Sequence, residues 1–263
     1  MDLTLPLQHW ELFAEGVWVT LHLTALALLI GFAISVPCAL AQVRGSRLAP
    51  IVRAYVYVFR GTPLIVQTYL IYYGLSQFDT VRDSVFWDAP GWVAGGWLEP
   101  FWPSLKSAWW CAVIAFSLNS GAYQTEILRG ALATTPAGEI EGARALGLSQ
   151  PQVTRLVWMP SAMRRALPQY GNEVVFMLHG SVVASVITLQ DILGAGRTLN
   201  AKYYLAYEGL VTAALLYMCV TFAIVLVFRL IERRYLRHLK IEAHRPSSFG
   251  AAASGGLDPA SAR

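Results

Sequence analysis

An uncharged apolar stretch at residues 17–41 constrains this chain more than any other feature. From Val17 to Ala41 there is no Asp, Glu, Lys or Arg. A helix needs about 20 apolar residues to cross the hydrocarbon core of a bilayer, and a chain in lipid must satisfy its own backbone hydrogen bonds. Hydrophobic residues make up 56% of the sequence and charged residues 14%. The sequence therefore predicts an all-α integral membrane protein.

Four more segments extend this pattern. We place further spans at 55–75, 106–127, 172–193 and 209–231, with residues 1–16 as an external segment and 241–263 as a disordered tail rich in Ser, Gly and Ala. Residues 1–16 contain no Lys or Arg, so they lack the basic region of a cleaved signal peptide, and we expect the first span to be retained. Because the fourth span carries polar side chains, it should face other helices or a water-filled cavity.

The distribution of basic residues predicts an orientation, because cytoplasmic loops collect Lys and Arg. The loops between the remaining spans are poor in Lys and Arg, and the first of them is net acidic and rich in Trp, as an interfacial segment would be. We therefore expect the N-terminus outside and the C-terminus in the cytoplasm. Most of the 20 basic residues lie in three loops or tails: Arg44, Arg47 and Arg53; Arg129, Arg144, Arg155, Arg164 and Arg165; Arg229, Arg233, Arg234, Arg237, Lys240, Arg245 and Arg263.

Several classes of function lack their signatures in this sequence. Cys38, Cys111 and Cys219 lie in separate apolar runs without a CxxC pair, so we expect neither a disulfide nor a metal site. There is no HExxH or GxSxG signature, no nucleic-acid-binding motif and no Gly-x4-Gly-Lys-Ser/Thr loop. We therefore expect no catalytic residues, no nucleic-acid partner and no cofactor bound by this chain.

The segment at about 129–169 is polar and lies between the third and fourth spans, on the predicted cytoplasmic side. Thr135 and Pro136 predict a helix start, with Thr as the cap and Pro at the first helical position, and Gly147 predicts its end. A second short helix should run from Gln150 until Pro160 interrupts it.

Side chains on the first of these helices suggest a docking surface. Ile140, Ala143 and Leu146 are expected to share one face, and Glu141 can pair with Arg144 at i, i+3. Small residues at 142 and 143 would let another surface approach the backbone.

The spacing Glu-Gly-Ala-x3-Gly-x9-Val-x-Met-Pro, from Glu141 to Pro160, resembles the EAA motif of binding-protein-dependent ABC importer permeases. Glu141, Ala143, Gly147 and Pro160 match that motif, whereas Gly142 stands where the family has Ala. Gly at that position weakens helix propensity by about 1 kcal/mol relative to Ala.

Three further motifs resemble the polar amino-acid branch of these permeases. Within that branch the chain looks most like permeases for histidine, lysine, arginine and ornithine, or for arginine and opines. The motifs are Phe59-Arg60-Gly61-Thr62-Pro63-Leu64 with Val66-Gln67, Ser117-Leu118-Asn119-Ser120 with Ala122-Tyr123 and Glu126-Ile127, and Ala166-Leu167-Pro168 with Asn172-Glu173-Val174.

This resemblance implies a type I ABC importer transmembrane domain over residues 17–240, in the bacterial inner membrane, carrying a polar and cationic amino acid or opine. The implied partners are an ATP-binding subunit dimer that holds ATP and Mg, a second permease subunit in a homodimer or heterodimer, a periplasmic amino-acid-binding protein and the lipid bilayer. The implied ATPase-coupling residues are Glu139, Ile140, Glu141, Gly142, Ala143, Arg144, Ala145, Leu146, Gly147 and Pro160.

Polar residues within or beside the spans are candidates for the substrate pathway, and each has an alternative role. Arg60 could anchor its helix at the inner interface, Glu126 could pair with Arg129, Glu173 could sit at a helix N-terminus, and His179 could be a packing residue. The candidates are Arg60, Asn119, Gln124, Glu126, Glu173, His179, Ser181 and Ser185. Asp191 is expected on the outer surface that receives the binding protein.

An ion-coupled secondary amino-acid transporter is the alternative function. Such a carrier needs its own coupling-ion site and usually shows inverted repeats with interrupted helices. An odd number of spans with one large cytoplasmic loop fits that architecture poorly.

Overall fold

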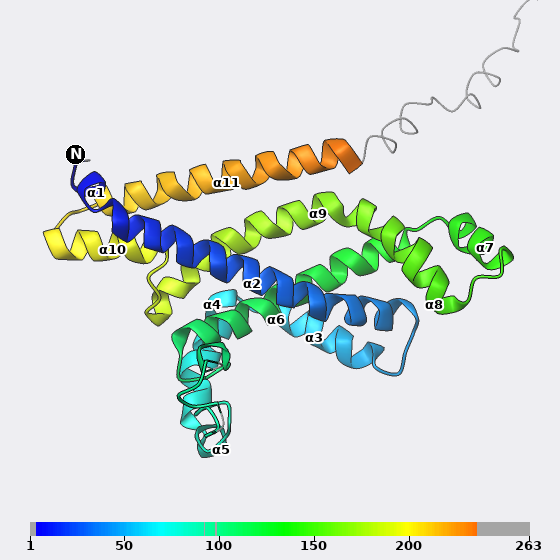
Figure 1. Cartoon of the computed structure of the whole chain (residues 1–263), viewed down its shortest axis with the longest axis horizontal. Helices are drawn as coiled ribbons and strands as arrows, with labels where there is room; N and C mark the ends of the chain where they lie inside the picture. The colour runs from blue at the N-terminus through cyan, green and yellow to red at the C-terminus, as the bar shows by residue number, and fades with distance from the viewer. Residues whose placement is uncertain (1–3, 92, 98, 236–263) are drawn as a thin grey trace, which may run out of the picture.

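Helices form all the regular secondary structure in residues 4–91, 93–97 and 99–235, the parts of the chain that this computed structural model describes. This confirms the predicted all-α class. The long helices run along one axis, with α7 and α8 at one end of the molecule and α1 and α10 at the other (Figure 1). The tail predicted at 241–263 and Trp92, one of the tryptophans expected at the membrane interface, lie outside the described residues.

The first predicted span is the middle of a longer helix, α2 (Trp10–Val43), which follows the short α1 (Thr4–Gln8). The second predicted span is not one helix. It is divided into α3 (Ala49–Gly61), α4 (Leu64–Tyr69), a π-helical turn η1 (Leu70–Gly74) and a short 3-10 turn η2 (Leu75–Gln77). Pro63 is the cause, because the residue before a proline is driven to extended backbone, and Thr62 has φ −116° and ψ 144°.

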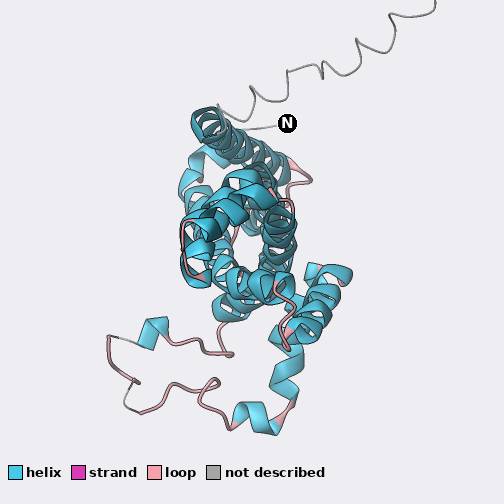
Figure 2. Ribbon diagram, turned by 90° about the vertical axis from the view of Figure 1, so that its right-hand side faces the viewer, coloured by secondary structure: helices cyan, strands magenta, loops and turns pink. Residues whose placement is uncertain are grey.

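Helix α6 (Ala108–Ala133) is the third predicted span and lies at the centre of the fold, along α2. Its backbone approaches α2 closely at Gly31 and Gly121: a Cβ on Gly31 would lie 2.9 Å from the Gly121 nitrogen. Leu23, Phe116 and Met177 are fully buried and join α2, α6 and α9 in one core cluster. The connection before α6 contains α5 (Asp79–Arg82) and η3 (Glu99–Phe101) and projects to one side of the helices (Figure 2).

The chain between α6 and the fourth predicted span is more continuous than expected. After α7 (Ala137–Ala145), α8 (Gln150–Gln152) runs through a π-helical stretch η4 (Val153–Trp158) into α9 (Met159–Gly180). The predicted interruption at Pro160 is wrong, because Pro160 lies in the first turn of α9, directly after a π-helical stretch that replaces the regular α-helical hydrogen bonds. Pro168 lies inside α9.

The predicted fourth span, 172–193, therefore begins inside α9, and it also breaks before its end. A 3-10 helix η5 (Ser181–Ile187) follows α9, and Thr188 then takes left-handed backbone with φ 74°. The next helix, α10 (Ile192–Tyr203), was not predicted. Gly196 in α10 packs directly on the backbone of Gly209 at the start of α11 (Glu208–Tyr235).

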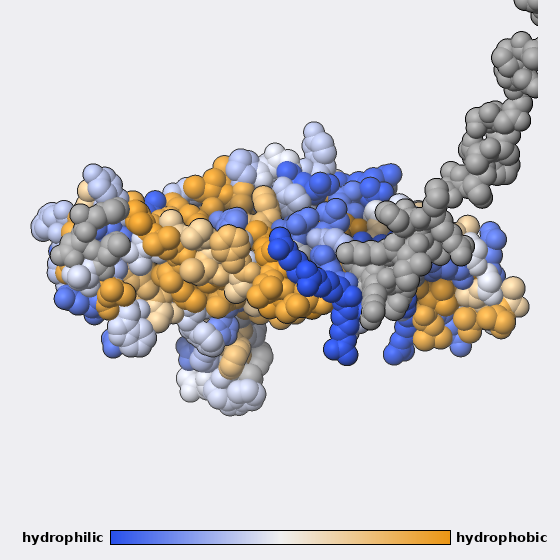
Figure 3. Space-filling view, turned by 90° about the horizontal axis from the view of Figure 1, so that it is seen from above, coloured by the Kyte–Doolittle hydropathy of each residue, from blue (hydrophilic) through white to orange (hydrophobic). Residues whose placement is uncertain are grey.

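Among the described residues, three helices are long and apolar enough to cross a membrane: Trp10–Val43, Gln150–Ile187 and Glu208–Tyr235. Helix α11 exposes Leu215, Met218, Phe222 and Leu226, and the face of the molecule that it covers shows a broad apolar region with hydrophilic residues gathered to one side of it (Figure 3). Five spans with an external N-terminus stay a prediction.

Candidate functional site

Helix α7 ends as the sequence predicts. Gly147 has φ 80°, and its N–H donates to the Arg144 carbonyl at 2.9 Å while the Leu148 N–H donates to the Ala143 carbonyl at 3.3 Å. Glycine adopts this left-handed backbone without the steric cost that a side chain would add. The predicted Thr135 cap is wrong, because Pro136 is the N-cap residue and the Thr135 hydroxyl donates to the Ala131 carbonyl at 3.2 Å.

The faces of α7 differ in part from the prediction. Ala143 is buried, whereas Leu146 is 84% exposed, so the two do not share a buried face. Gly142 has open space where a Cβ would stand. Arg144 donates to Gln150 at 3.4 Å, and the predicted pair with Glu141 is not among the ion pairs of the described residues. The outward surface of α7 thus presents small and apolar groups: Gly142, Ala145, Leu146 and Gly147, with the charges of Glu141 and Arg144 beside them.

Asn119 and Gln67 close the break between α3 and α4. Gln67 donates to the Phe59 carbonyl at 2.9 Å and to the Thr62 carbonyl at 3.0 Å. Asn119, which is 2% exposed, donates to the same Phe59 carbonyl at 3.1 Å and to the Gln67 side-chain oxygen at 3.0 Å. The end of a helix leaves carbonyls without partners, and such groups are expensive in a bilayer. Asn119 therefore holds the break together.

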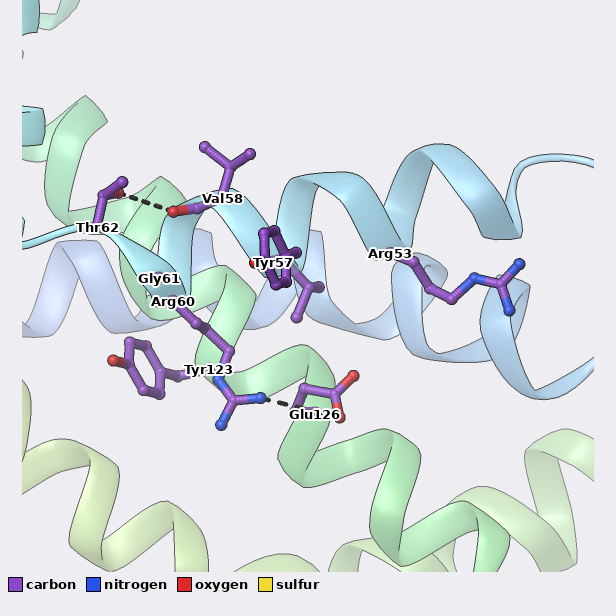
Figure 4. Close-up of a pocket in the computed structure, with 9 residues that line it drawn as sticks. Arg53, Tyr57, Val58, Arg60, Gly61, Thr62, Tyr123 and Glu126 are labelled. Atoms are coloured by element: carbon purple, nitrogen blue, oxygen red, sulfur yellow. Dashed lines mark hydrogen bonds and ion pairs between the residues drawn. The ribbon is translucent and has the colours of Figure 1, made fainter.

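Two adjoining cavities of about 640 and 680 Å³ lie beside this break. Both are lined by Arg60, Gly61, Thr62 and Tyr123; Glu126 lines the first and Asn119 and His179 line the second. The Arg60 side chain reaches between Tyr123 and Glu126 (Figure 4). Its guanidinium carbon is 5.2 Å from the centre of the Tyr123 ring, and its Nη1 is 3.9 Å from the Glu126 carboxylate.

Glu126 is bound mainly by Arg129. Three hydrogen bonds of 2.8 to 3.1 Å join the Arg129 guanidinium to the Glu126 carboxylate, so the structural pair weighed from the sequence is present. Since Arg60 and Arg129 both face one carboxylate, this part of the cavity carries more positive than negative charge. Arg60 remains 43% exposed and open to the cavity.

Gln124 and Glu173 join three helices in the interior. Gln124 donates to the Leu28 carbonyl of α2 at 3.1 Å and to the Ser120 hydroxyl at 2.9 Å, and Ser120 donates to Glu173 of α9 at 2.8 Å. Glu173 is 5% exposed and lies well inside α9, so its predicted place at a helix N-terminus is wrong, because α9 begins earlier. Neither Gln124 nor Glu173 lines the two cavities.

The remaining pathway candidates lie around the end of α9. His179 lines the second cavity, and its Nε2 is 3.0 Å from the Thr221 hydroxyl of α11. The hydroxyls of Ser181 and Ser185 donate to backbone carbonyls three residues earlier, at 2.6 and 2.9 Å. Of these three residues, only His179 combines an inter-helix contact with access to the cavity.

Asp191 is fully buried, so the prediction that it forms part of an outer surface is wrong. Its carboxylate accepts from the Gly194 N–H at 2.7 Å and from the Tyr217 hydroxyl at 2.9 Å. Asp191 is the N-cap of α10, where a carboxylate satisfies free N–H groups. The prediction missed this because it did not expect α10.

A protein-family model matches most of the chain. Residues 20–237 match the model described as "Binding-protein-dependent transport system inner membrane component". The chain belongs to this family. It is therefore an inner membrane component of a transport system that works with a binding protein, and the expected localisation in the inner membrane is confirmed.

Curated relatives cover most of this inner membrane component. It is 39% identical over 231 residues to the octopine transport system permease protein OccM of Rhizobium meliloti, covering 86% of this chain and 88% of that protein. It is 36% identical over 226 residues to the histidine/lysine/arginine/ornithine transport system permease protein HisM of Escherichia coli K12, covering 86% and 89%. These relatives lend no support to an ion-coupled carrier.

Solved structures show the same fold. A chain of an amino acid ABC transporter crystallised with histidines superposes with a TM-score of 0.73 at 31% identity, covering 89% of this chain and 99% of that one. A chain of the methionine transporter MetNI, in an inward-facing conformation, superposes with a TM-score of 0.67 at 19% identity, covering 85% and 96%. The predicted type I ABC importer fold is thereby confirmed.

Sequence reasoning did not assign Gln67 and Tyr123 to the site. The signal for Gln67 was Pro63: a helix broken in the bilayer leaves carbonyls that need donors nearby in the chain. Tyr123 belongs to one of the family motifs, but its role depends on where α6 places it relative to Arg60.

Proposed function

We propose that this chain is one permease subunit of an ATP-driven importer for a polar amino acid or an opine. Similarity to OccM and HisM along most of the chain supports this class of substrate. The observation that carries the proposal is the joint presence, in one chain, of a cavity lined by Arg60 beside a broken helix and of an exposed docking helix, α7, at one end of the molecule.

The cavity suits the part of a substrate that amino acids and octopine share, the carboxylate. Arg60 presents a planar guanidinium that can bind a carboxylate through two parallel hydrogen bonds. The Tyr123 ring beside it holds the guanidinium from one face. A cationic side chain of the substrate would have to lie away from Arg60, toward His179 or toward a second subunit.

Helix α7 suits a rigid partner that approaches its backbone. Its outer surface lacks a side chain at Gly142 and presents Leu146 almost completely to solvent. We infer that an ATP-binding subunit, which would hold ATP and Mg, receives α7 in a cleft. A second permease subunit would complete the pathway, and a periplasmic amino-acid-binding protein would deliver the substrate. The coupling residues are those from Glu139 to Gly147, with Pro160 behind them in α9.

A charge reversal on α7 tests this proposal. In proteoliposomes with the ATPase and the binding protein, Glu141→Lys should abolish uptake of labelled L-arginine or octopine and the stimulation of ATP hydrolysis, while the permease still inserts. Glu232→Lys makes the same charge change near the C-terminal end of α11 and should transport as the unaltered protein does. Normal uptake and stimulation by Glu141→Lys would show that α7 does not dock the ATPase.

A further inference from the structure

We propose that Arg165 is a positioning residue that transmits the movement of α7 directly to α9. This inference rests on the proposed function, in which α7 docks the ATPase. Arg165 lies near the start of α9, and its guanidinium contacts both the connection before α7 and α7 itself. One Nη is 3.6 Å from the Glu139 carboxylate, and the other donates to the Thr135 hydroxyl at 2.8 Å and to the Ser161 hydroxyl at 2.9 Å.

These four residues form a closed cluster, which we call the Arg165 clamp: Thr135, Glu139, Ser161 and Arg165. The Ser161 hydroxyl also donates to the Glu139 carboxylate, so Glu139 is held by two side chains of α9. Thr135 is bonded in turn to the Ala131 carbonyl of α6. The clamp therefore fixes the first turn of α7 against the ends of both α6 and α9.

The clamp matters because the covalent route from α7 to α9 is indirect. That route passes through Gly147 in left-handed backbone, through α8 and through the π-helical stretch η4. A π-helical stretch is an irregular form of helix that occurs often at functional sites. Helix α7 also packs against η4. Arg165 joins the beginning of α7 to α9 beyond this stretch, so a displacement of α7 has a second route to α9 that does not pass through η4.

Helix α9 leads from the clamp to the interior network and the cavity. It carries Glu173, which is bonded to Ser120 of α6, and further along it carries His179, which lines the second cavity. A planar guanidinium with several fixed donors suits this task better than a flexible ammonium. Arg165 thus connects the surface that would receive the ATPase to the helix that borders the substrate cavity.

The test uses the complete transporter in nanodiscs and measures the ratio of ATP hydrolysis with and without binding protein loaded with L-arginine or octopine. We expect Arg165→Ala and Glu139→Gln each to lower this ratio by about tenfold, which is within the usual range of coupling between sites. The double change Glu139→Arg with Arg165→Glu should restore most of it, because the opposite charges face each other again. Arg164→Ala removes the same charge from the neighbouring, exposed residue and should keep the ratio.

A Gly142→Cys variant distinguishes this inference from the proposed function. A cross-link from Cys at position 142 to the ATPase shows that α7 docks there. If that cross-link forms while Glu139→Gln and Arg165→Ala both keep the full ratio, the clamp does not transmit movement and this inference alone is wrong. Failure of the cross-link to form would overturn the docking of α7 and the inference with it. If Arg165→Ala does not assemble, Glu139→Gln and the double change decide the question.

Discussion

The side-chain amide of Asn119 in α6 donates a 3.0 Å hydrogen bond to the side-chain oxygen of Gln67 in α4. The pair closes the break between α3 and α4, because both amides also donate to the Phe59 carbonyl. Without these donors, a broken helix in the bilayer would leave its carbonyls unsatisfied. The Asn119–Gln67 pair makes the interruption between α3 and α4 compatible with a membrane environment. This interruption lies beside the two cavities.

Loss of the Asn119 amide should destabilise the protein. Asn119→Leu keeps similar bulk but removes two buried hydrogen bonds, and an unsatisfied buried group costs about 1–3 kcal/mol. We expect a fall in melting temperature of about 2–4 °C for each kcal/mol lost, measured by intrinsic fluorescence in detergent. Ser76→Ala removes an exposed local hydrogen bond and should leave the melting temperature unchanged. Equal melting temperatures for Asn119→Leu and the unaltered protein would show that the break needs no such donor.

The close approach of α2 and α6 should not tolerate a methyl group. A Cβ on Gly31 would lie 2.9 Å from a backbone nitrogen, so the helices must separate, and overpacking of this kind costs about 1–3 kcal/mol. Gly31→Ala should therefore lower the melting temperature. Gly130→Ala in α6 meets no atom within 4 Å and gains helix propensity, so it should maintain or raise the melting temperature. The same decrease for both variants would contradict the packing described here.

Removal of Arg60 should weaken substrate binding in the pathway. A hydrogen bond to a charged group contributes about 1.5–3 kcal/mol, so Arg60→Ala should raise the KM for uptake by roughly tenfold or more. Arg60→Lys keeps the charge without the planar fork and should show a smaller effect. Arg47→Ala, an exposed arginine of the α2–α3 connection, is the control. An unchanged KM in Arg60→Ala would mean that Arg60 only anchors its helix at the membrane interface.

The exposed Leu146 should contribute to the ATPase contact. Leu146→Asp places a charge on the apolar tip of α7, and burying an unpaired carboxylate in an apolar contact costs more than about 1 kcal/mol. We expect at least fivefold weaker retention of the ATPase when the permease is purified in detergent. Leu48→Asp alters a similarly exposed leucine in the α2–α3 connection and should retain the ATPase. If the two variants retain the ATPase equally, Leu146 lies outside the contact.

Part of this structure could be predicted from local sequence signals. Gly147 predicted the end of α7, and the long uncharged run predicted α2. The i, i+3 spacing between Glu126 and Arg129 predicted their ion pair. Each of these signals is contiguous in the sequence: the first and third depend on residues within one or two helical turns, and the second on one unbroken apolar run. The motif spacing likewise indicated the family, which the family model confirms, whereas the coupling role of α7 stays a prediction.

Other features depend on residues that are distant in the sequence. Pro160 looked like a helix end, yet the helix continues past it, because a π-helical stretch and packing against α6 outweigh the local preference. Asp191 looked like a surface charge, yet it caps a helix that polarity alone did not reveal. The Arg165 clamp likewise required the position of α7 against α9, which no local pattern supplies.

Uptake by the reconstituted transporter tests the central claim most directly. Proteoliposomes would contain this permease with its partner subunits, and labelled L-arginine or octopine would be supplied with the binding protein outside and ATP inside. The account predicts uptake that requires ATP, the ATPase and the binding protein, and that persists when ionophores collapse the ion gradients. Uptake by liposomes containing this chain without the ATPase, driven by an ion gradient, would contradict it.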